Sequence, residues 1–185
     1  MAILKIARMG HPVLKARAEP VADPKSQEIQ QLVRDMVETL EDVGGIGLAA
    51  PQVHVSRRVV IFYVPGDRRA TSGEPAEDIP LTVLINPEVE ALSEEKASGV
   101  EACLSVPGLA GPVPRWTHIR YRALDLAGGM LEREARGYHA RVVQHECDHL
   151  DGILYPMRMT DLSSLTFVEE LRRFGDGQKA EEGQR

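Results

Sequence analysis

The 185-residue sequence predicts an α+β fold in which antiparallel strands pack around a central helix, with a further helix near the C-terminus. Two observations favour this fold class. Several strand-like segments surround one helical segment, and strands and helices do not alternate regularly as they do in a doubly wound sheet. The length is typical of one domain, which we expect to cover residues 1–174.

The first element is a helix, which we expect at residues 25–43. Apolar side chains recur there at steps of three and four residues and therefore share one helical face. Asp23 is the expected N-cap, Pro24 the expected first helical residue, and Gly44 the residue at which the helix ends. The apolar face indicates that this helix packs on a core.

Strands are expected next. The apolar runs at 59–64 and 81–85 are typical of strands, and a loop rich in Gly, Pro and acidic residues separates them at 65–80. Alternating apolar and polar residues at 117–124 predict another strand, and a Gly-Gly turn leads to one more at 130–136. The last two strands are expected to form an antiparallel hairpin.

The C-terminal part is expected to be helical. One helix should cover 139–150 and end near Gly152, and another should cover 161–174 with an apolar stripe. Residues 175–185 contain no apolar side chain larger than alanine, which predicts a disordered tail.

Composition and charge exclude several classes of protein. The chain has 22 Lys and Arg against 28 Asp and Glu, a formal charge of −6, which does not favour binding to nucleic acid or to anionic membranes. No apolar run approaches the roughly 20 residues that span a bilayer, and the first residues do not resemble a secretory signal. Two cysteines, Cys103 and Cys147, do not suggest a disulfide scaffold. We expect a cytosolic protein, and a monomer because no exposed apolar stripe is evident.

The strongest chemical signal is the His-Glu-x-x-His pattern within the predicted helix 139–150. His145 and His149 are four residues apart, so both imidazoles project from one helical face and can bind the same metal ion. Glu146 lies beside them and is suited to proton transfer. Cys147 points to the far side of the helix and is expected to be a buried structural thiol. The central helix is therefore predicted to bind metal.

A third protein ligand is still needed, and two sources remain open. A zinc peptidase would use a downstream carboxylate, and Glu169 or Glu170 are the available choices. Alternatively, the thiolate of Cys103 with two imidazoles makes a three-ligand site suited to zinc or Fe(II), which leaves a position free for catalysis.

One more segment has a suggestive composition. Residues 45–52, Gly-Ile-Gly-Leu-Ala-Ala-Pro-Gln, follow the first helix as an apolar loop of small residues. Its glycines permit close approach of a ligand to the backbone, and Gln52 offers an amide donor that can polarise a carbonyl. By itself, however, the segment indicates a helix stop and a turn.

Together the three segments resemble the motifs of the peptide deformylase family, metallohydrolases that remove the formyl group from N-formylmethionyl nascent chains. The first motif, Gly-x-Gly-Leu-Ala-Ala-Pro-Gln, is matched by 45–52. The second, Glu-Gly-Cys-Leu-Ser, is matched at four of five positions by 101–105, and the third, His-Glu-x-Asp-His, by 145–149. The resemblance implies a bacterial cytoplasmic enzyme that acts in protein biosynthesis.

The resemblance also implies roles for individual residues. Cys103, His145 and His149 would bind Fe²⁺, for which Zn²⁺, Ni²⁺ or Co²⁺ can substitute, and Glu146 would serve as general base and then acid. The remaining implied groups are an oxyanion site at Gln52 and the backbone N–H of Leu104, a methionine pocket at Ile46, Val142 and His145, and backbone pairing with the substrate at Gly47 and Ala102.

Two departures from the family pattern affect these expectations. Ala102 stands where the family usually has glycine, so it either strains a backbone with positive φ or adds a methyl group beside the substrate. Residues 161–185 carry four basic and six acidic side chains, which does not favour ribosome docking through a basic tail. A catalytically silent binder of formylated N-termini therefore remains an alternative, together with the zinc peptidase.

Overall fold

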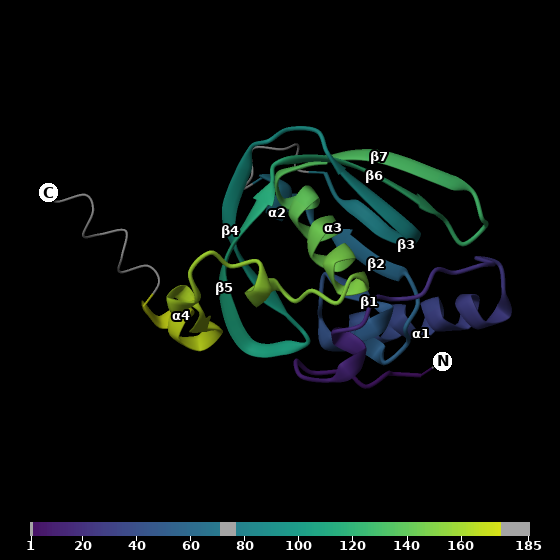
Figure 1. Cartoon of the computed structure of the whole chain (residues 1–185), viewed down its shortest axis with the longest axis horizontal. Coiled ribbons are helices and arrows are strands. Elements are labelled where there is room, and N and C mark those ends of the chain that lie inside the picture. Colours follow the sequence, from purple (N-terminus) through teal and green to yellow (C-terminus); the bar gives the residue numbers. More distant parts are fainter. Residues whose placement is uncertain (1, 71–76, 175–185) are drawn as a thin grey trace, which may run out of the picture.

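Two antiparallel sheets form the framework of the computed structural model, which describes residues 2–70 and 77–174 (Figure 1). The five-stranded sheet has the order β1-β2-β3-β6-β7, and the three-stranded sheet has the order β4-β5-β8. The strands of the larger sheet are β1 (Gly47–Ala49), β2 (Val59–Val64), β3 (Ile79–Ala91), β6 (His118–Leu124) and β7 (Met130–Arg136). Those of the smaller sheet are β4 (Lys96–Cys103), β5 (Val106–Trp116) and β8 (Thr166–Phe167).

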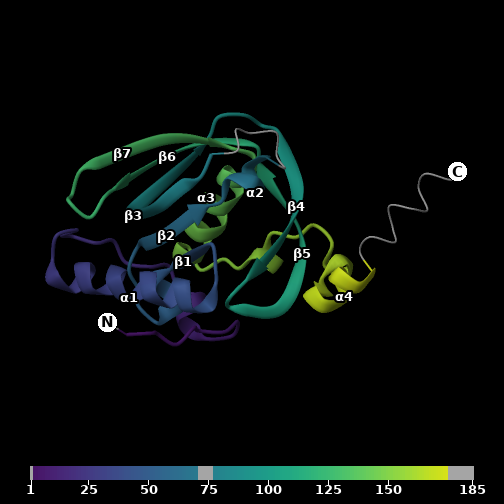
Figure 2. The ribbon, with the colours of Figure 1, turned by 180° about the vertical axis from the view of Figure 1, so that it is seen from behind.

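The helices complete the predicted α+β fold. Within the described residues they are α1 (Gln27–Val43), α2 (Gly66–Ala70), α3 (Gly137–Leu150) and α4 (Val168–Phe174). Figures 1 and 2 show α3 between the two sheets, and it contacts strands of both, while α1 packs on β1 and β2. No helix in the described ranges is long and apolar enough to cross a membrane.

Strand β2 shows that the larger sheet is covered on both faces. Its side chains alternate: Val59 and Ile61 pack into the cluster that contains α1, and Val60 and Phe62 pack into the cluster that contains α3. All four side chains are fully buried. A strand covered on both faces needs a continuous apolar run rather than an alternating one, and residues 59–64 have such a run.

The start of α1 differs from the prediction. The helix begins at Gln27, and the N-cap is Ser26, whose side chain accepts a hydrogen bond from the backbone N–H of Ile29 at 3.4 Å. Asp23 instead accepts from the backbone N–H of Lys25 and forms a turn before the helix. The predicted end is confirmed, because Gly44 adopts the left-handed conformation of a C-cap, with φ of 64°.

Most of the predicted strands are confirmed, with changes in length. β2 matches the predicted range, β3 extends well beyond 81–85, and the β6–β7 hairpin forms with Leu124 opposite Met130. The predicted loop at 65–80 contains the short helix α2, while residues 71–76 lie outside the described residues.

The hairpin of β4 and β5 was not predicted, although it carries much of the functional site. The two strands pair from Lys96 opposite Trp116 to Ala102 opposite Ala110, where the register shifts before Cys103. Cys103 therefore lies at the end of a strand, directly before the turn to β5.

The helix predicted at 161–174 is wrong in its first half. Residues Leu162–Ser164 form a 3₁₀ turn, Thr166–Phe167 form β8, and α4 begins at Val168. The strand β8 pairs with Leu109 and Ala110 of β5, and this pairing interrupts the helical pattern. The predicted disorder at 175–185 lies outside the described residues.

Candidate active site

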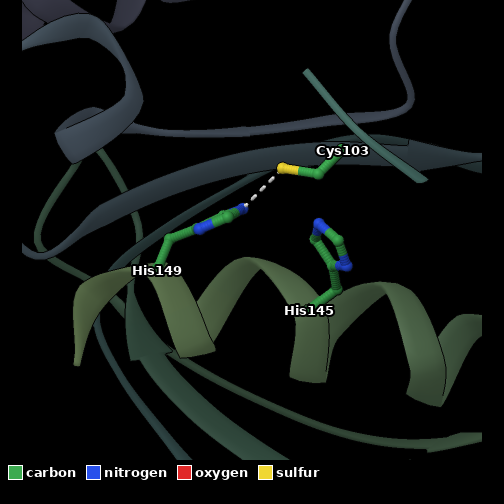
Figure 3. Close-up of side chains that lie close together, drawn as sticks. All are labelled: Cys103, His145 and His149. Carbon is green, nitrogen blue, oxygen red and sulfur yellow. Dashed lines mark hydrogen bonds between the residues drawn. The ribbon is translucent and has the colours of Figure 1, made fainter. Parts of the chain in front are cut away.

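The last residue of β4 and one face of α3 bring three metal-ligand side chains together (Figure 3). One ligand atom from each of Cys103, His145 and His149 lies within 4.8 Å of the others. The Sγ atom of Cys103 is 3.4 Å from Nε2 of His149, and the two imidazole rings are nearly perpendicular, at 84°. The prediction that two histidines four residues apart share one face is confirmed.

The donor set fits a tetrahedral metal ion. Ligand bonds of about 2.3 Å to sulfur and 2.1 Å to nitrogen place two such ligands about 3.6 Å apart at a tetrahedral angle, close to the distance observed between Cys103 and His149. All three side chains are buried, so the ligands need not be taken out of water when an ion binds. This group could therefore hold a metal ion with one position free.

Glu101 orients His145 from behind. Its Oε2 lies 2.8 Å from Nδ1 of His145, which leaves Nε2 for a ligand. Arg115 binds the carboxylate through two hydrogen bonds of 2.9 and 3.0 Å, and Arg141 adds one of 2.8 Å. Burial raises the pKa of Glu101, but the hydrogen bonds and charges of His145 and Arg115 outweigh it and hold the pKa at about 2. Glu101 is therefore a permanent anion.

The same arginine links Glu101 to a second buried carboxylate. Arg115 donates to Asp148, and Arg158 donates to both oxygens of Asp148 at 3.1 and 2.8 Å. The sequence motifs did not indicate a role for Glu101, Asp148 or these arginines. The signal for the two acids was present, since both occur inside the quoted motifs, whereas the arginines lie outside every motif.

The side chain of Glu146 is buried beside the Cys-His-His group. Burial raises its pKa to about 7, and its Oε2 is buried without a hydrogen-bond partner in the described structure. A Cβ atom built on Gly47 would lie 2.3 Å from Oε1 of Glu146, so the carboxylate packs directly against this glycine. Glycine at position 47 is thus required by the position of Glu146.

Gln52 is fixed in a buried 3₁₀ turn, Ala50–Val53, that follows β1. Its Oε1 accepts from the backbone N–H of Ala49 at 2.9 Å, which orients the amide. Its Nε2 donates to Ser105 Oγ at 3.2 Å and toward Cys103 Sγ at 3.5 Å. The amide N–H group therefore faces the Cys-His-His group, as an oxyanion donor must.

The N-terminal segment joins the two loops that carry these groups. The backbone N–H of Ala7 donates to the carbonyl of Gln52, and that of Met9 donates to the carbonyl of Ser105, both at 2.7 Å. No pattern in the sequence indicated these contacts. They fix the turn that holds Gln52 relative to the tip of the β4–β5 hairpin.

A pocket of about 740 Å³ opens onto the group. It lies within the range of volumes that is typical of ligand sites. Its wall includes His145 and Glu146, whereas His149 lies deeper. The residues expected at the oxyanion site and the substrate pocket all line it: Gln52, Leu104, Ile46, Gly47, Ala102 and Val142.

Three further expectations concern single residues. Ala102 is in a β-strand and is not among the residues with positive φ, so alanine causes no backbone strain at this position. Cys147 packs into the core cluster between α3 and the larger sheet, and burial raises the pKa of its thiol far above the ordinary value. Glu169 and Glu170 lie on α4 and do not belong to the one metal-ligand group found among the described residues.

A Cys-His-His group that could hold a metal ion, next to a buried carboxylate at the wall of an open pocket, is typical of a hydrolase. Residues 3–164 match the family model described as polypeptide deformylase. The chain belongs to the peptide deformylase family and is a hydrolase with that family's activity.

Individual relatives agree with this assignment. The chain is 50% identical to peptide deformylase 1 of Bordetella pertussis over 166 residues, which cover 90% of this chain and 93% of that protein. Among solved structures, it is similar to a class I type b peptide deformylase from Acinetobacter baumannii with Met-Ala-Ser bound. The TM-score is 0.77 and the identity 38%, over 85% of this chain and 99% of the other. The actinonin-bound structure of a deformylase from the same organism aligns with a TM-score of 0.74 at 36% identity.

Proposed function

We propose that Glu146, beside a ferrous ion bound by Cys103, His145 and His149, removes the N-formyl group from formylmethionine at the start of newly made polypeptides. The observation that carries this proposal is the buried carboxylate of Glu146 next to a Cys-His-His group at the wall of an open pocket. The domain that performs the reaction is residues 1–174, and α3 is its metal-binding helix.

The ion is expected to be Fe²⁺, which Zn²⁺, Ni²⁺ or Co²⁺ can replace. One thiolate and two imidazoles suit all four ions, and zinc binds more tightly than ferrous iron in the general order of affinity. When bound, the ion supplies Lewis acidity and lowers the pKa of a coordinated water. His145 is held for this task by Glu101, whose carboxylate fixes the ring so that Nε2 faces the site.

Glu146 moves the proton. Its pKa of about 7, raised by burial, lies near physiological pH, where one group can serve as both acceptor and donor. The carboxylate takes a proton from the water that attacks the formyl carbon. It then donates that proton to the departing amine, so that formate and a free N-terminus are released.

Gln52 and Leu104 stabilise the charge that develops on the formyl oxygen. Nε2 of Gln52 donates to two uncharged or weak acceptors, Ser105 Oγ and Cys103 Sγ, and one of these bonds gives way to the stronger bond that an oxyanion accepts. The backbone N–H of Leu104, next to the ligand Cys103, is the second donor. These two donors hold the carbonyl in place for attack.

The substrate is expected to bind as an extended strand. β1 and β4 are edge strands of their sheets, and both border the pocket, through Gly47 and Ala102 respectively. An edge strand offers free backbone groups to an added peptide. Ile46 and Val142 supply apolar surface for the methionine side chain. The Met-Ala-Ser peptide in the Acinetobacter baumannii relative supports this type of ligand.

The cellular setting follows from the same proposal. The partners are N-formylmethionyl peptides and nascent chains in a bacterial cytoplasm. The enzyme is expected to be a monomer that binds neither nucleic acid nor membrane. Contact with the ribosome is expected to be transient, without docking through the acidic tail. These statements rest on the family resemblance and on the charge of −6.

The decisive experiment compares formyl-Met-Ala and acetyl-Met-Ala as substrates for the wild type and Glu146→Gln. The wild type should release formate and reject the acetyl peptide, because we expect Gln52, Leu104 and the bound ion to enclose the formyl carbon too closely for an added methyl group. The kcat of Glu146→Gln should fall by roughly 10²-fold or more, with metal content unchanged. Comparable cleavage of the formyl and acetyl peptides would contradict the proposed substrate. A normal kcat in Glu146→Gln would contradict the proposed role of Glu146. Binding of the formyl peptide without turnover by the wild type would indicate a silent binder.

The ligand set has its own test with a matched cysteine control. Cys103→Ala should lose tightly bound metal, because two imidazoles alone hold an ion weakly. Cys147→Ser should keep the full complement, since that thiol faces the core. Full metal content in Cys103→Ala would support the zinc peptidase alternative, with Glu169 or Glu170 as the third ligand.

The identity of the ion is tested by reconstitution. Activity with iron should be high and lost in air, because ferrous iron beside a thiolate oxidises, whereas nickel or cobalt should give steadier activity. Equal activity and equal stability in air with every metal would contradict the assignment of iron.

A further inference from the structure

The wall of the active-site pocket includes a helix that the family model does not cover. The family match ends at residue 164, whereas Val168, Leu171 and Arg172 of α4 line the same pocket as His145 and Glu146. Figures 1 and 2 show α4 beside β5, on the side of the hairpin away from β6 and β7. One part of the pocket is therefore built by a segment beyond the matched domain.

α4 is held in this position by two sets of contacts. The strand β8 directly before it pairs with Leu109 and Ala110 of β5. Leu165 packs against the apolar cluster that contains Cys103 and Val106. The helix is thus anchored at its N-terminal side to the same hairpin that carries the predicted metal ligand.

The pocket-facing side of α4 carries two apolar side chains and one arginine, Arg172. Val168 and Leu171 are three residues apart, which places them on one face of the helix, and both are half-buried. Pro107 and Leu109 of the hairpin line the same pocket, so apolar surface is present on both elements. Glu169 and Glu170 occupy the intervening positions and do not line the pocket, so the apolar surface that α4 offers to it comes from Val168 and Leu171, beside Arg172.

We propose that α4 and the tip of the β4–β5 hairpin form an apolar subsite for substrate residues that follow the first two of the nascent chain. This inference rests on the proposed deformylase function. The occupant is the substrate itself, because the subsite is continuous with the pocket that contains Glu146. An extended peptide advances about 3.3 Å per residue. Residues beyond the second therefore lie away from the Cys-His-His group and near the part of the pocket wall that α4 forms. The enzyme therefore prefers formylated chains with apolar residues at positions three and four.

The test measures coupling between α4 and the distal residues of the substrate. Three peptides are used: formyl-Met-Ala, formyl-Met-Ala-Leu-Leu and formyl-Met-Ala-Ser-Ser. The wild type should have a KM for the Leu-Leu peptide roughly tenfold below that for the Ser-Ser peptide, a ratio that burial of one or two apolar side chains supports. In the double variant Val168→Ser/Leu171→Ser the ratio should fall to about one, and the loss in kcat/KM should be larger for the Leu-Leu peptide than for formyl-Met-Ala.

Controls on the same helix make the result specific. Phe174→Ser removes an exposed apolar side chain of α4 that does not line the pocket, and it should leave the ratio unchanged. Leu171→Asn alone should lower the ratio in the same direction as the double variant. A ratio preserved in the double variant, or equal losses on all three peptides, would overturn the inference. Absence of formate release from every peptide by the wild type would instead contradict the deformylase function itself.

Discussion

Gly47 shows how closely single residues define this site. Its missing side chain makes room for the carboxylate of Glu146, which packs against the backbone of β1. Gly47→Ala should therefore displace Glu146 and lower kcat by about 10-fold to 100-fold, while metal content stays near normal, because the nearest atoms that the added methyl group would meet belong to Glu146 and not to a predicted ligand. Steady-state kinetics with metal analysis provide the measurement.

A double variant tests whether the glycine acts through Glu146. If it does, adding Gly47→Ala to Glu146→Gln should cause little further loss, since the group to be displaced is already inactive. Losses that simply multiply would show that Gly47 acts on the substrate instead, through its backbone.

Glu101 is the second residue whose removal should be measurable. Glu101→Gln keeps the shape but loses the charge that orients His145, so metal affinity should fall by roughly 10-fold to 100-fold. Competition with a chelator of known affinity measures this change. Glu132→Gln is the control, because its carboxylate pairs with Arg122 on the exposed side of β7 and should leave metal affinity unaltered.

The sequence predicts the ligands of this site better than their supports. His145, His149 and Glu146 are related by helical periodicity, which is local, and Cys103 was paired with them by the chemistry of the donor set. Glu101 and Arg115 depend on contacts between β4, β5 and α3 that span 14 to 44 residues of sequence. No local pattern encodes such partners, so they appear first in the structure.

At the scale of elements, the β4–β5 hairpin was missed because its sequence is rich in residues that break strands. Gly99 interrupts the first strand, and five glycines or prolines occur between residues 107 and 114, where they favour turns when read locally. In the structure Pro112 and Pro114 have a partner on the β4 side, whereas β8 pairs only with Leu109 and Ala110. The proline-containing part of β5 therefore has a free edge among the described strands, where proline is tolerated.

The first turn of α3 contains a buried histidine that should make stability depend on pH. Nε2 of His139 shares a hydrogen bond of 3.2 Å with the hydroxyl of Tyr121, and burial, with the charges of Arg133 and Arg69, lowers the pKa of His139 to about 4. The unfolded chain takes up this proton near pH 6.5, so stability is full above that pH and falls as the pH drops toward 4. The total loss from this group is about 3 kcal/mol.

His139→Gln should remove this contribution. Urea unfolding at several pH values between 7 and 4 should show a smaller decline for the variant than for the wild type. Parallel declines for the two proteins would mean that His139 is protonated in the folded state without cost.

At the scale of the whole molecule, the proposed metal ion connects separate parts of the fold. Cys103 belongs to the hairpin, and the two histidines belong to the helix between the sheets, so an ion bound only by the folded chain stabilises all of these elements together. Removal of metal by a chelator should lower the Tm measurably, since an ion present at 1,000 times its Kd contributes about 4 kcal/mol. Cys103→Ala should show no such dependence on chelator, and a dependence that persists would place the ion elsewhere.

The N-terminal segment has a consequence for the order of events during synthesis. Residues 7 and 9 leave the ribosome before their hydrogen-bond partners, Gln52 and Ser105, and the proposed site is complete only once His149 has followed. At roughly 5–20 residues per second, on the order of 10 s pass between the synthesis of residues 7 and 9 and the synthesis of residue 149. A chain that is still being translated therefore lacks part of the proposed site until residue 149 has emerged from the ribosome.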